Sequence, residues 1–178
     1  MDRSKKMNWI KNFLRENGLF ILVIIGIFLL RIYVFTPFAV DGISMDYTLQ
    51  QDDLLIGVKY FNIDRNDIVI LDSPTVEGDQ YIKRVIGLPG DTISMQDDVL
   101  YINGEVIDES EYLSEETVAN NTGMQDLAEF VVPEGEYFVM GDNRNHSFDG
   151  TEFGPIPEDT INAEILFRYW PLNRMGGL

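Results

Sequence analysis

Apolar positions form one long run near the N-terminus and many short runs after it. The long run covers Leu19–Leu30 without a charged side chain, and Ile32–Phe35 continues it after Arg31. The whole stretch spans seventeen residues, which is near the lower limit for a helix that crosses a bilayer. Because the run has no polar face, it predicts a membrane-spanning helix over residues 18–35, with Arg31 reaching toward the interface.

After Pro37 the pattern changes to short β-branched runs that alternate with turn residues, which is typical of antiparallel β-domains. Asn103-Gly104 stands between Val99–Ile102 and Glu105–Ile107 and is a strong signal for a tight hairpin. The expected strands are Leu54–Val58, Asp67–Leu71, Tyr81–Ile86, Val99–Ile102, Phe130–Val132, Tyr137–Met140 and Ile165–Tyr169. We therefore expect a mainly β protein, with an antiparallel β-sheet domain over residues 36–178 behind one N-terminal helix.

Ser110–Leu127 differs from its surroundings because it is polar, acidic and short of β-branched clusters. We expect a loop with a helical turn there, inside a small cap-like segment inserted at about residues 95–130. The membrane helix is the only long helix that the pattern predicts, and no internal repeat is visible.

Composition narrows the possible chemistry. The chain has 178 residues, of which 45% are hydrophobic, enough for one domain with a buried core. It has no Cys, which excludes disulfides, a thiol nucleophile and cysteine-bound zinc. A net charge of −17 argues against nucleic acid as a partner, because phosphate binding needs a basic surface.

The charge is distributed unevenly between the two parts of the chain. Residues 1–31 hold six basic and two acidic residues, whereas residues 32–178 hold seven basic and twenty-eight acidic ones. By the positive-inside rule, residues 1–17 are expected to be a cytoplasmic tail and residues 36–178 to lie outside the cell membrane, a single-pass arrangement.

Two other interpretations of the apolar run stay open. A buried core helix is disfavoured by the basic flank and by the missing polar face. A cleaved signal peptide would need a cut near Val40-Asp41-Gly42, which matches the small-x-small pattern poorly.

The single histidine and the acidic pairs offer little for catalysis. His146 lies in the polar stretch Asp142–Ser147 and is read as a solvated turn residue. Asp97-Asp98 and Glu115-Glu116 lack the regular ligand spacing of a calcium loop, so we expect neither metal nor cofactor.

A serine nucleophile with a lysine base is the remaining option. Ser44 follows the membrane segment, and Gly42 permits backbone geometries that aim amides at an oxyanion. Strand alternation places Lys83 on one face with Tyr81, where burial would lower its pKa and make it a competent base. Spacing alone favours the alternative, an edge-strand lysine that reaches solvent.

Several sequence motifs occur together in one order, which is more specific than any one of them alone. They are Phe35-Thr-Pro-Phe38, Ser44-Met-Asp-Tyr-Thr-Leu49, Asn66-Asp-Ile-Val-Ile70, Tyr81-Ile-Lys-Arg-Val-Ile-Gly-Leu-Pro-Gly-Asp91, Gly141-Asp-Asn-Arg-Asn-His-Ser-Phe-Asp149 and Phe167-Arg-Tyr-Trp-Pro-Leu172. With these motifs the chain resembles, over nearly its whole length, the bacterial type I signal peptidases, most closely their short Gram-positive form.

The resemblance implies a Ser/Lys dyad, with Ser44 as the nucleophile and Lys83 as the general base. It implies an oxyanion hole at the Ser44 amide and Gly42, and a structural role for Arg84. The residues that would support the dyad are Ser147, which would orient the lysine amine, and Asp142, Arg144 and Asp149. The residues that would line two shallow pockets for small substrate side chains are Phe38, Val40, Met45, Leu49, Tyr81 and Ile82. The substrate would bind as an added strand beside residues 38–42 and 80–83.

The chain departs from the family pattern at two positions. Tyr47 stands where the family has proline, and Thr151 stands where it has arginine. The segment between Asp91 and Gly141 is also short, at about fifty residues. The dyad positions are intact, so we expect activity, with a narrowed substrate range.

The resemblance implies a membrane-anchored serine endopeptidase that cleaves signal peptides from secreted preproteins after small-x-small sites. We expect it to be a monomer. The alternative is a signal-peptidase-like accessory or chaperone protein dedicated to a few substrates such as pilus subunits. A self-cleaving Ser/Lys regulator is disfavoured, because residues 1–35 form a membrane segment and not a DNA-binding module. A structural surface protein is the remaining possibility.

Overall fold

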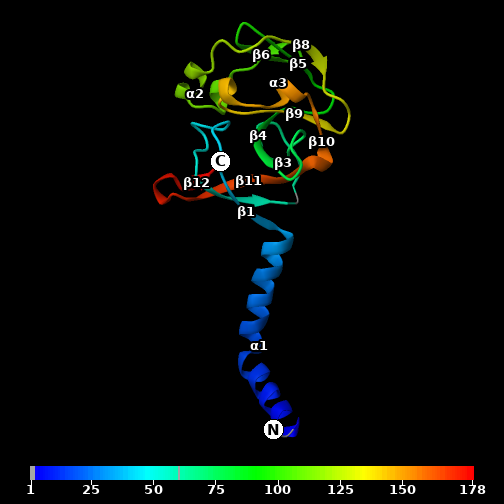
Figure 1. Cartoon of the computed structure of the whole chain (residues 1–178), viewed down its shortest axis with the longest axis vertical. Coiled ribbons are helices and arrows are strands. Elements are labelled where there is room, and N and C mark those ends of the chain that lie inside the picture. The colour runs from blue at the N-terminus through cyan, green and yellow to red at the C-terminus, as the bar shows by residue number, and fades with distance from the viewer. Residues whose placement is uncertain (1–2, 60) are drawn as a thin grey trace. The chain divides into compact units, whose positions relative to one another are not determined.

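The computed structural model describes residues 3–59 and 61–178, and the chain divides after Thr36 into two compact units. The first unit holds helix α1 (Arg3–Tyr33), which begins earlier than the apolar run predicted (Figure 1). Within the described ranges, Arg15–Tyr33 is the one helical stretch long and apolar enough to cross a membrane, with a mean hydropathy of 1.9. Its apolar side chains are exposed along the helix, Leu19 by 79%, as expected of a segment that packs against lipid.

The second unit, Pro37–Leu178, contains two antiparallel sheets. The larger sheet has the strand order β1-β2-β11-β3-β4-β9-β10, with β12 paired to β11. Its strands are β1 (Phe35–Ala39), β2 (Leu54–Val58), β3 (Ile68–Asp72), β4 (Gln80–Gly87), β9 (Glu136–Met140), β10 (Ile156–Pro157), β11 (Ile161–Trp170) and β12 (Gly176–Gly177). The mainly β, antiparallel fold that the sequence predicted is confirmed.

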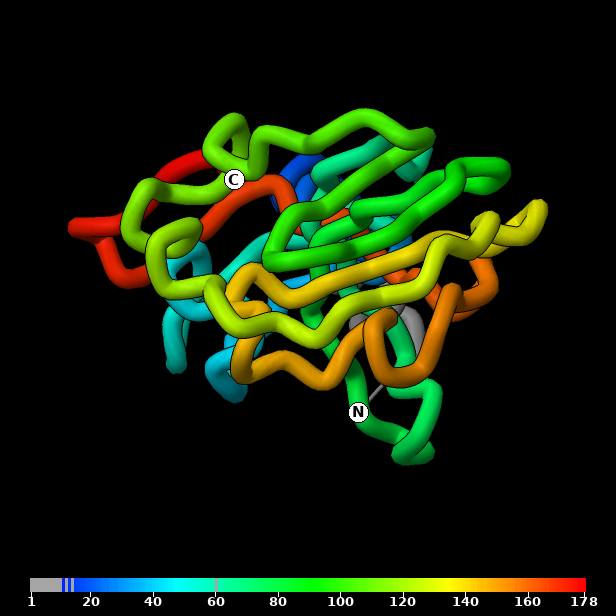
Figure 2. Tube along the Cα trace, turned by 90° about the horizontal axis from the view of Figure 1, so that it is seen from above, coloured from blue at the N-terminus to red at the C-terminus, as the bar shows by residue number. Residues whose placement is uncertain are grey.

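The smaller sheet has the order β7-β6-β5-β8, and its longer strands run side by side in green to yellow in Figure 2. Its strands are β5 (Thr92–Gln96), β6 (Val99–Ile102), β7 (Glu105–Val106) and β8 (Leu127–Val131). This sheet occupies the part of the chain that was expected to be a cap-like insertion. The Asn103-Gly104 hairpin is present, with Ile102 opposite Glu105 and positive φ at both turn residues.

Short helical segments connect the strands. The segments are η1 (Glu109–Glu111), α2 (Glu115–Asn120), η2 (Arg144–His146), α3 (Gly150–Phe153), η3 (Glu158–Thr160) and η4 (Leu172–Arg174). The helical turn expected within Ser110–Leu127 is α2, which Ser114 caps by accepting a hydrogen bond from the Thr117 amide.

Strand β4 decides where the polar residues of the site lie. It lies between β3 and β9 in the middle of the larger sheet, and its adjacent residues Val85 and Ile86, which point to opposite faces, are both buried. Ile82, Val85 and Ile86 enter three different apolar clusters of the core. Lys83 and Arg84 are consequently buried, with 3% and 6% of their surface exposed. The alternative of an edge-strand lysine that reaches solvent is therefore wrong.

Candidate active site

Ser44 lies on the loop between β1 and β2, residues 40–53, which we call the Ser44 loop. Two backbone hydrogen bonds close the loop at its base, from the Val40 amide to the Asp53 carbonyl (2.9 Å) and from the Asp52 amide to the Val40 carbonyl (3.0 Å). Within it, the Leu49 amide donates to the Met45 carbonyl at 2.7 Å, forming a tight turn. Met45 and Leu49 are buried in the core below, so the turn is fixed by its own apolar side chains and Ser44 is half-buried above them.

The Lys83 amine lies 2.8 Å from the Ser44 hydroxyl, in hydrogen-bond contact. The two residues are thirty-nine positions apart in the sequence, and the sheet brings them together. Burial lowers the pKa of Lys83 to about 8, against the opposing attraction of the Asp149 and Asp142 carboxylates. A substantial fraction of this amine is therefore neutral near pH 8, and a neutral amine can accept the proton of a serine hydroxyl.

The segment that follows β9, residues 141–149, forms a wall beside the Ser44 loop. The Asn143 amide donates to the Ser44 carbonyl, and its side-chain Nδ2 donates to the Ile43 carbonyl, both at 3.0 Å. Gly141 permits this approach, because a Cβ atom there would lie 2.5 Å from the Ser44 carbonyl oxygen. These contacts fix the backbone on both sides of Ser44.

Two buried charges hold the wall in place. Asp142 accepts two hydrogen bonds from Arg84, at 2.8 and 2.7 Å, which ties the wall to β4 in a bidentate ion pair. Arg144 donates from Nε to the Gly141 carbonyl at 2.9 Å and pairs with Glu109 of the cap segment. Asp142 and Arg144 are both buried, and each contacts the backbone or side chains that hold the wall.

Asp149 closes the wall. Its carboxylate accepts hydrogen bonds from the Gly141 amide at 2.8 Å and from the amide and hydroxyl of Thr151 at 3.0 and 2.8 Å. Thr151, which stands where the family pattern has arginine, therefore donates two hydrogen bonds to the Asp149 carboxylate.

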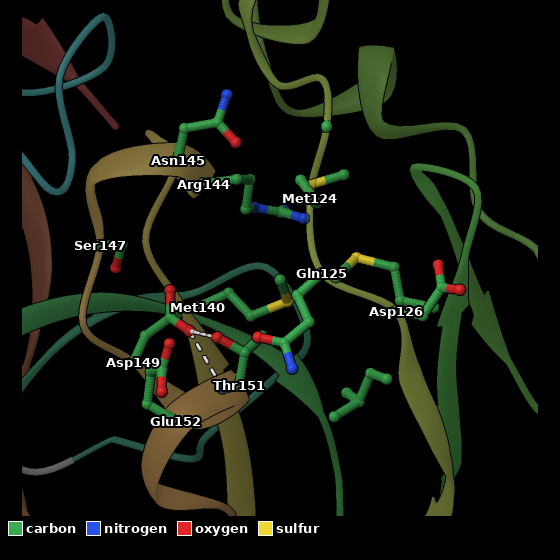
Figure 3. A pocket seen from close by; sticks show the side chains of 13 residues that line it. Met124, Gln125, Asp126, Met140, Arg144, Asn145, Ser147, Asp149, Thr151 and Glu152 are labelled. Atoms are coloured by element: carbon green, nitrogen blue, oxygen red, sulfur yellow. Dashed lines mark hydrogen bonds between the residues drawn. The ribbon is translucent and has the colours of Figure 1, made fainter.

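The Ser147 hydroxyl is buried and has no hydrogen-bond partner in the described part of the chain; Nη1 of Arg144 is in the same situation. Figure 3 shows both side chains, with Asp149 and Thr151, around a cavity of about 230 Å³. The structure thus places Ser147 in the wall and leaves its hydroxyl available to a new partner.

Gly42 has φ +105°, a left-handed conformation that favours glycine. Its amide donates to Oε1 of Gln51 at 2.8 Å. Within residues 3–59 and 61–178, no acceptor lies in hydrogen-bond range of the Ser44 amide. Of the two expected oxyanion donors, the Ser44 amide is the one that is open in this structure.

A cleft of about 300 Å³, with polar as well as apolar residues in its lining, leads to Ser44 and Lys83. Most of the side chains predicted to bind substrate line it: Phe38, Val40, Met45, Tyr81 and Ile82. Leu49 does not, because it is fully buried in the core beneath the Ser44 loop. Residues 80–83 of β4 pair with β3 on one side, while β9 pairs with β4 only from Arg84 onward. The cleft side of β4 therefore presents an unpaired strand edge.

Sequence reasoning missed several residues that hold the site. Asn143 lies inside a quoted motif but carries no chemistry that singles it out. Asn121 donates to the Asp142 carbonyl at 2.8 Å and accepts from the Arg144 amide at 3.0 Å, and nothing in its sequence neighbourhood signals this.

His146 is exposed, with Nδ1 3.1 Å from the Asn143 side-chain oxygen. In the described ranges no three His, Cys, Asp or Glu side chains are grouped to hold a metal ion.

An antiparallel β-sheet unit and a cleft that contains a serine hydroxyl bonded to a buried amine are features of a serine hydrolase with a mainly β fold. The family model described as signal peptidase, peptidase S26, matches residues 9–170. The chain belongs to this family and is a signal peptidase I enzyme.

Curated relatives named signal peptidase I agree with this assignment. The chain is 36% identical to one from Streptococcus pneumoniae, over 96% of this chain and 99% of that protein. It is 39% identical to one from Bacillus licheniformis, over 90% and 94% of the two chains. A crystal structure of a signal peptidase I from Enterococcus faecalis is 34% identical, with a TM-score of 0.48, and the match covers 58% of this chain and 97% of that one.

Proposed function

We propose that the protein is a serine endopeptidase, anchored in the cell membrane by α1, that cuts signal peptides from secreted preproteins with a Ser44–Lys83 dyad. The single observation that carries this proposal is the 2.8 Å contact between the Lys83 amine and the Ser44 hydroxyl. Burial of Lys83 supports it, because it favours the neutral amine that the reaction needs. No cofactor takes part.

In the proposed reaction, neutral Lys83 takes the proton of the Ser44 hydroxyl as the oxygen attacks the scissile carbonyl. The Ser44 amide stabilises the oxyanion, and the Gly42 amide joins it once it leaves Gln51. The lysine ammonium then protonates the departing amine, leaving an acyl ester on Ser44. Lys83, with Ser147 as a new hydrogen-bond partner, next takes a proton from water as the water attacks the acyl ester. The ammonium returns this proton to the Ser44 oxygen as the signal peptide leaves, which restores Ser44.

The substrate is proposed to bind as an extended strand along the unpaired edge of β4, with β1 on the other side. Apolar side chains such as Phe38, Val40 and Ile82 form part of the cleft's lining. We propose that they form the two shallow pockets that hold small residues one and three positions before the cut.

The anchor gives the enzyme access to its substrate. With α1 in the bilayer, the N-terminus in the cytoplasm and residues 36–178 outside, protease and membrane-inserted preprotein share one surface. Confinement to a plane raises their effective concentration without any added contact. We propose that the enzyme acts there as a monomer.

The test is cleavage of a membrane-inserted preprotein with an Ala-x-Ala site by the purified full-length protein. Wild type should cut at that site, and Ser44→Ala and Lys83→Ala should each lose nearly all turnover, because the two side chains act as a unit. Turnover retained by either alanine variant would exclude the dyad.

The second candidate function is that of an accessory protein with weak or narrow catalysis. It would be dedicated to a few preproteins, such as pilus subunits. Tyr47 favours it, because this bulky side chain is 37% exposed on the Ser44 loop. Comparison of several unrelated preproteins decides between the two: similar rates for all of them would exclude a dedicated enzyme.

A further inference from the structure

Asp53 is a fully buried carboxylate at the base of the Ser44 loop. Its Oδ2 accepts a hydrogen bond from the Gln50 amide at 2.9 Å and lies 3.3 Å from Nη1 of Arg168. Its Oδ1 pairs with Arg174. Both arginines belong to the C-terminal segment of the chain, β11 and the turn η4 that follows it.

Arg168 extends past Asp53 into the Ser44 loop itself. The same Nη1 donates to the Thr48 carbonyl at 2.8 Å, and Nε donates to the Arg174 carbonyl. Thr48 stands four residues after Ser44, in the turn that Met45 and Leu49 close. Arg168 therefore joins three segments: the turn that carries Ser44, the base of its loop, and the C-terminal turn.

We propose that Arg168, held by Asp53, is a positioning residue for catalysis that sets the geometry of Ser44 through the Thr48 carbonyl. The proposal rests on the proposed role of Ser44 as the nucleophile. Arg168 is not a catalytic residue, because its contacts end at the backbone behind the turn.

The Ser44 loop needs such a restraint. On the wall side, Asn143 holds the Ile43 and Ser44 carbonyls. Between Ser44 and Thr48 the chain passes through Tyr47, a non-glycine residue held in a strained left-handed conformation at φ +76°. Met45 and Leu49 hold the turn from the core side, but without Arg168 the Thr48 carbonyl would lose its side-chain donor and the turn could shift to relax this strain. Because a displacement of about 1 Å can cost roughly a hundredfold in rate, such relaxation would separate Ser44 from Lys83 or turn its amide away from the oxyanion.

Arg174 provides a matched control. Its side chain pairs with the same Asp53 carboxylate but makes no described contact with Thr48. The described contact between Arg174 and Arg168 is made by the Arg174 backbone carbonyl, which a substitution to alanine keeps. Arg174→Ala thus removes an ion pair of Asp53 and leaves the bond from Arg168 to Thr48 in place. A purely structural role for the cluster predicts that Arg168→Ala and Arg174→Ala behave alike.

The experiment measures kcat, KM and thermal unfolding for the full-length wild type, Arg168→Ala, Arg174→Ala and Ser44→Ala on one preprotein, well below the unfolding temperature. We expect Arg168→Ala to lower kcat on the order of 10- to 100-fold with KM within about twofold, and Arg174→Ala to keep kcat while lowering the unfolding temperature. Equal kcat for wild type and a folded Arg168→Ala variant would overturn the proposal.

Two additional measurements keep the result decisive if Arg168→Ala folds poorly. Arg168→Lys keeps the charge beside Asp53, but a single nitrogen cannot reproduce the spread of bonds from Nε and Nη1, so we expect a lowered kcat in a folded protein. Ethylguanidinium at millimolar concentration should raise the kcat of Arg168→Ala, whereas ethylammonium should not. Wild-type kcat in Arg168→Lys, or absence of guanidinium rescue in a folded Arg168→Ala variant, would count against positioning. Activity retained by Ser44→Ala would instead refute the dyad, so the two failures are distinguishable.

Discussion

At the scale of single residues, the lysine that serves the proposed reaction also weakens the fold. Lys83 sits in an apolar interior with a pKa near 8, whereas an unfolded lysine titrates near ~10.4. Between these values the unfolded chain binds more protons than the folded one, so folding stability should rise with pH through this window. Below pH 8 the amine is charged in both the folded and the unfolded chain, so its burial lowers the folding stability by an amount that no longer changes with pH.

The first prediction follows from this shift. Activity should rise with pH with a midpoint near 8 as Lys83 loses its proton. Lys83→Met, which buries a neutral chain of similar length, should abolish activity and raise the free energy of unfolding at pH 7 on the order of 2 kcal/mol. Denaturant titrations of both proteins at pH 7 and pH 10 check the sign: the gain should shrink at the higher pH. A variant less stable than wild type at pH 7 would contradict it.

The second prediction concerns Tyr47. Proline fixes φ near ~−65°, so it cannot take the +76° that Tyr47 has here, and it would also lose the amide that donates to Asp46 at 3.0 Å. Tyr47→Pro should therefore distort the turn and lower both stability and turnover. Tyr47→Gly should raise stability by about 1 kcal/mol.

Thermal unfolding and turnover of the two variants test this, with Tyr47→Phe as the control that keeps the backbone strain. A fully active and stable Tyr47→Pro protein would show that the turn follows a different path from the one described here.

At the scale of elements, the close approach of the β9 wall to the Ser44 loop depends on a residue without a side chain. A Cβ atom at Gly141 would lie 2.2 Å from the Ser147 hydroxyl oxygen and 2.5 Å from the Ser44 carbonyl oxygen. Neither neighbour can move freely, because Ser147 lies within the wall and the Ser44 carbonyl is bound by Asn143.

The third prediction is that Gly141→Ala separates these elements. We expect activity to fall on the order of 100-fold with a clear loss of thermal stability. Gly176→Ala in β12 is the control, because a Cβ atom there meets nothing within 4 Å. Similar activities for the two variants would show that the wall tolerates displacement.

Strand β4 shows why one element supplies both the proposed base and the main cross-link of the site. The centre of β4 is covered on both faces, and adjacent residues of a strand point to opposite faces. Lys83 and Arg84 are therefore both buried. Lys83 meets Ser44, and Arg84 meets Asp142. Removing Asp142 alone would leave a buried guanidinium without its partner, which is more damaging than replacing both residues together.

At the scale of the whole molecule, the anchor and the β-unit have separate roles. The β-unit has its own apolar clusters, built from residues after Pro37, and the site lies within it. The residues that line the cleft all belong to the β-unit, between positions 38 and 83. Its proposed contribution is confinement to the membrane.

The fourth prediction follows from this division of labour. A chain that begins at Val34 should still cleave a soluble peptide with an Ala-x-Ala site at a rate close to that of the full-length protein. Its rate on a preprotein in lipid vesicles should fall by about 100-fold or more, because the effective concentration is lost. Parallel assays of both proteins on both substrates check this; equal losses on peptide and preprotein would mean that α1 supports the fold itself.

The sequence by itself determined the class of the fold, and it supplied the prediction of a Ser44–Lys83 dyad. A run of apolar residues without a polar face can only be a helix in lipid or in a core, and alternating β-branched runs with turn residues between them can only close as sheet. Leu54–Val58 and Val99–Ile102 were predicted with the bounds that β2 and β6 have. Ser44 and Lys83 were predicted as a dyad from motifs that resemble those of a known family, since spacing alone favoured a lysine that reaches solvent.

Only the tertiary structure decided which strand is central and which polar groups meet. The strand pattern of Tyr81–Ile86 fits an edge or a centre equally well, and only the folded domain shows that Lys83 is buried in contact with Ser44. Leu49 follows Ser44 closely in sequence, yet its turn directs it into the core. Asn143, Asp53 and Arg168 act through contacts between segments up to more than one hundred residues apart. Local patterns carry no information on such contacts, because they form only when the sheet has brought distant segments side by side.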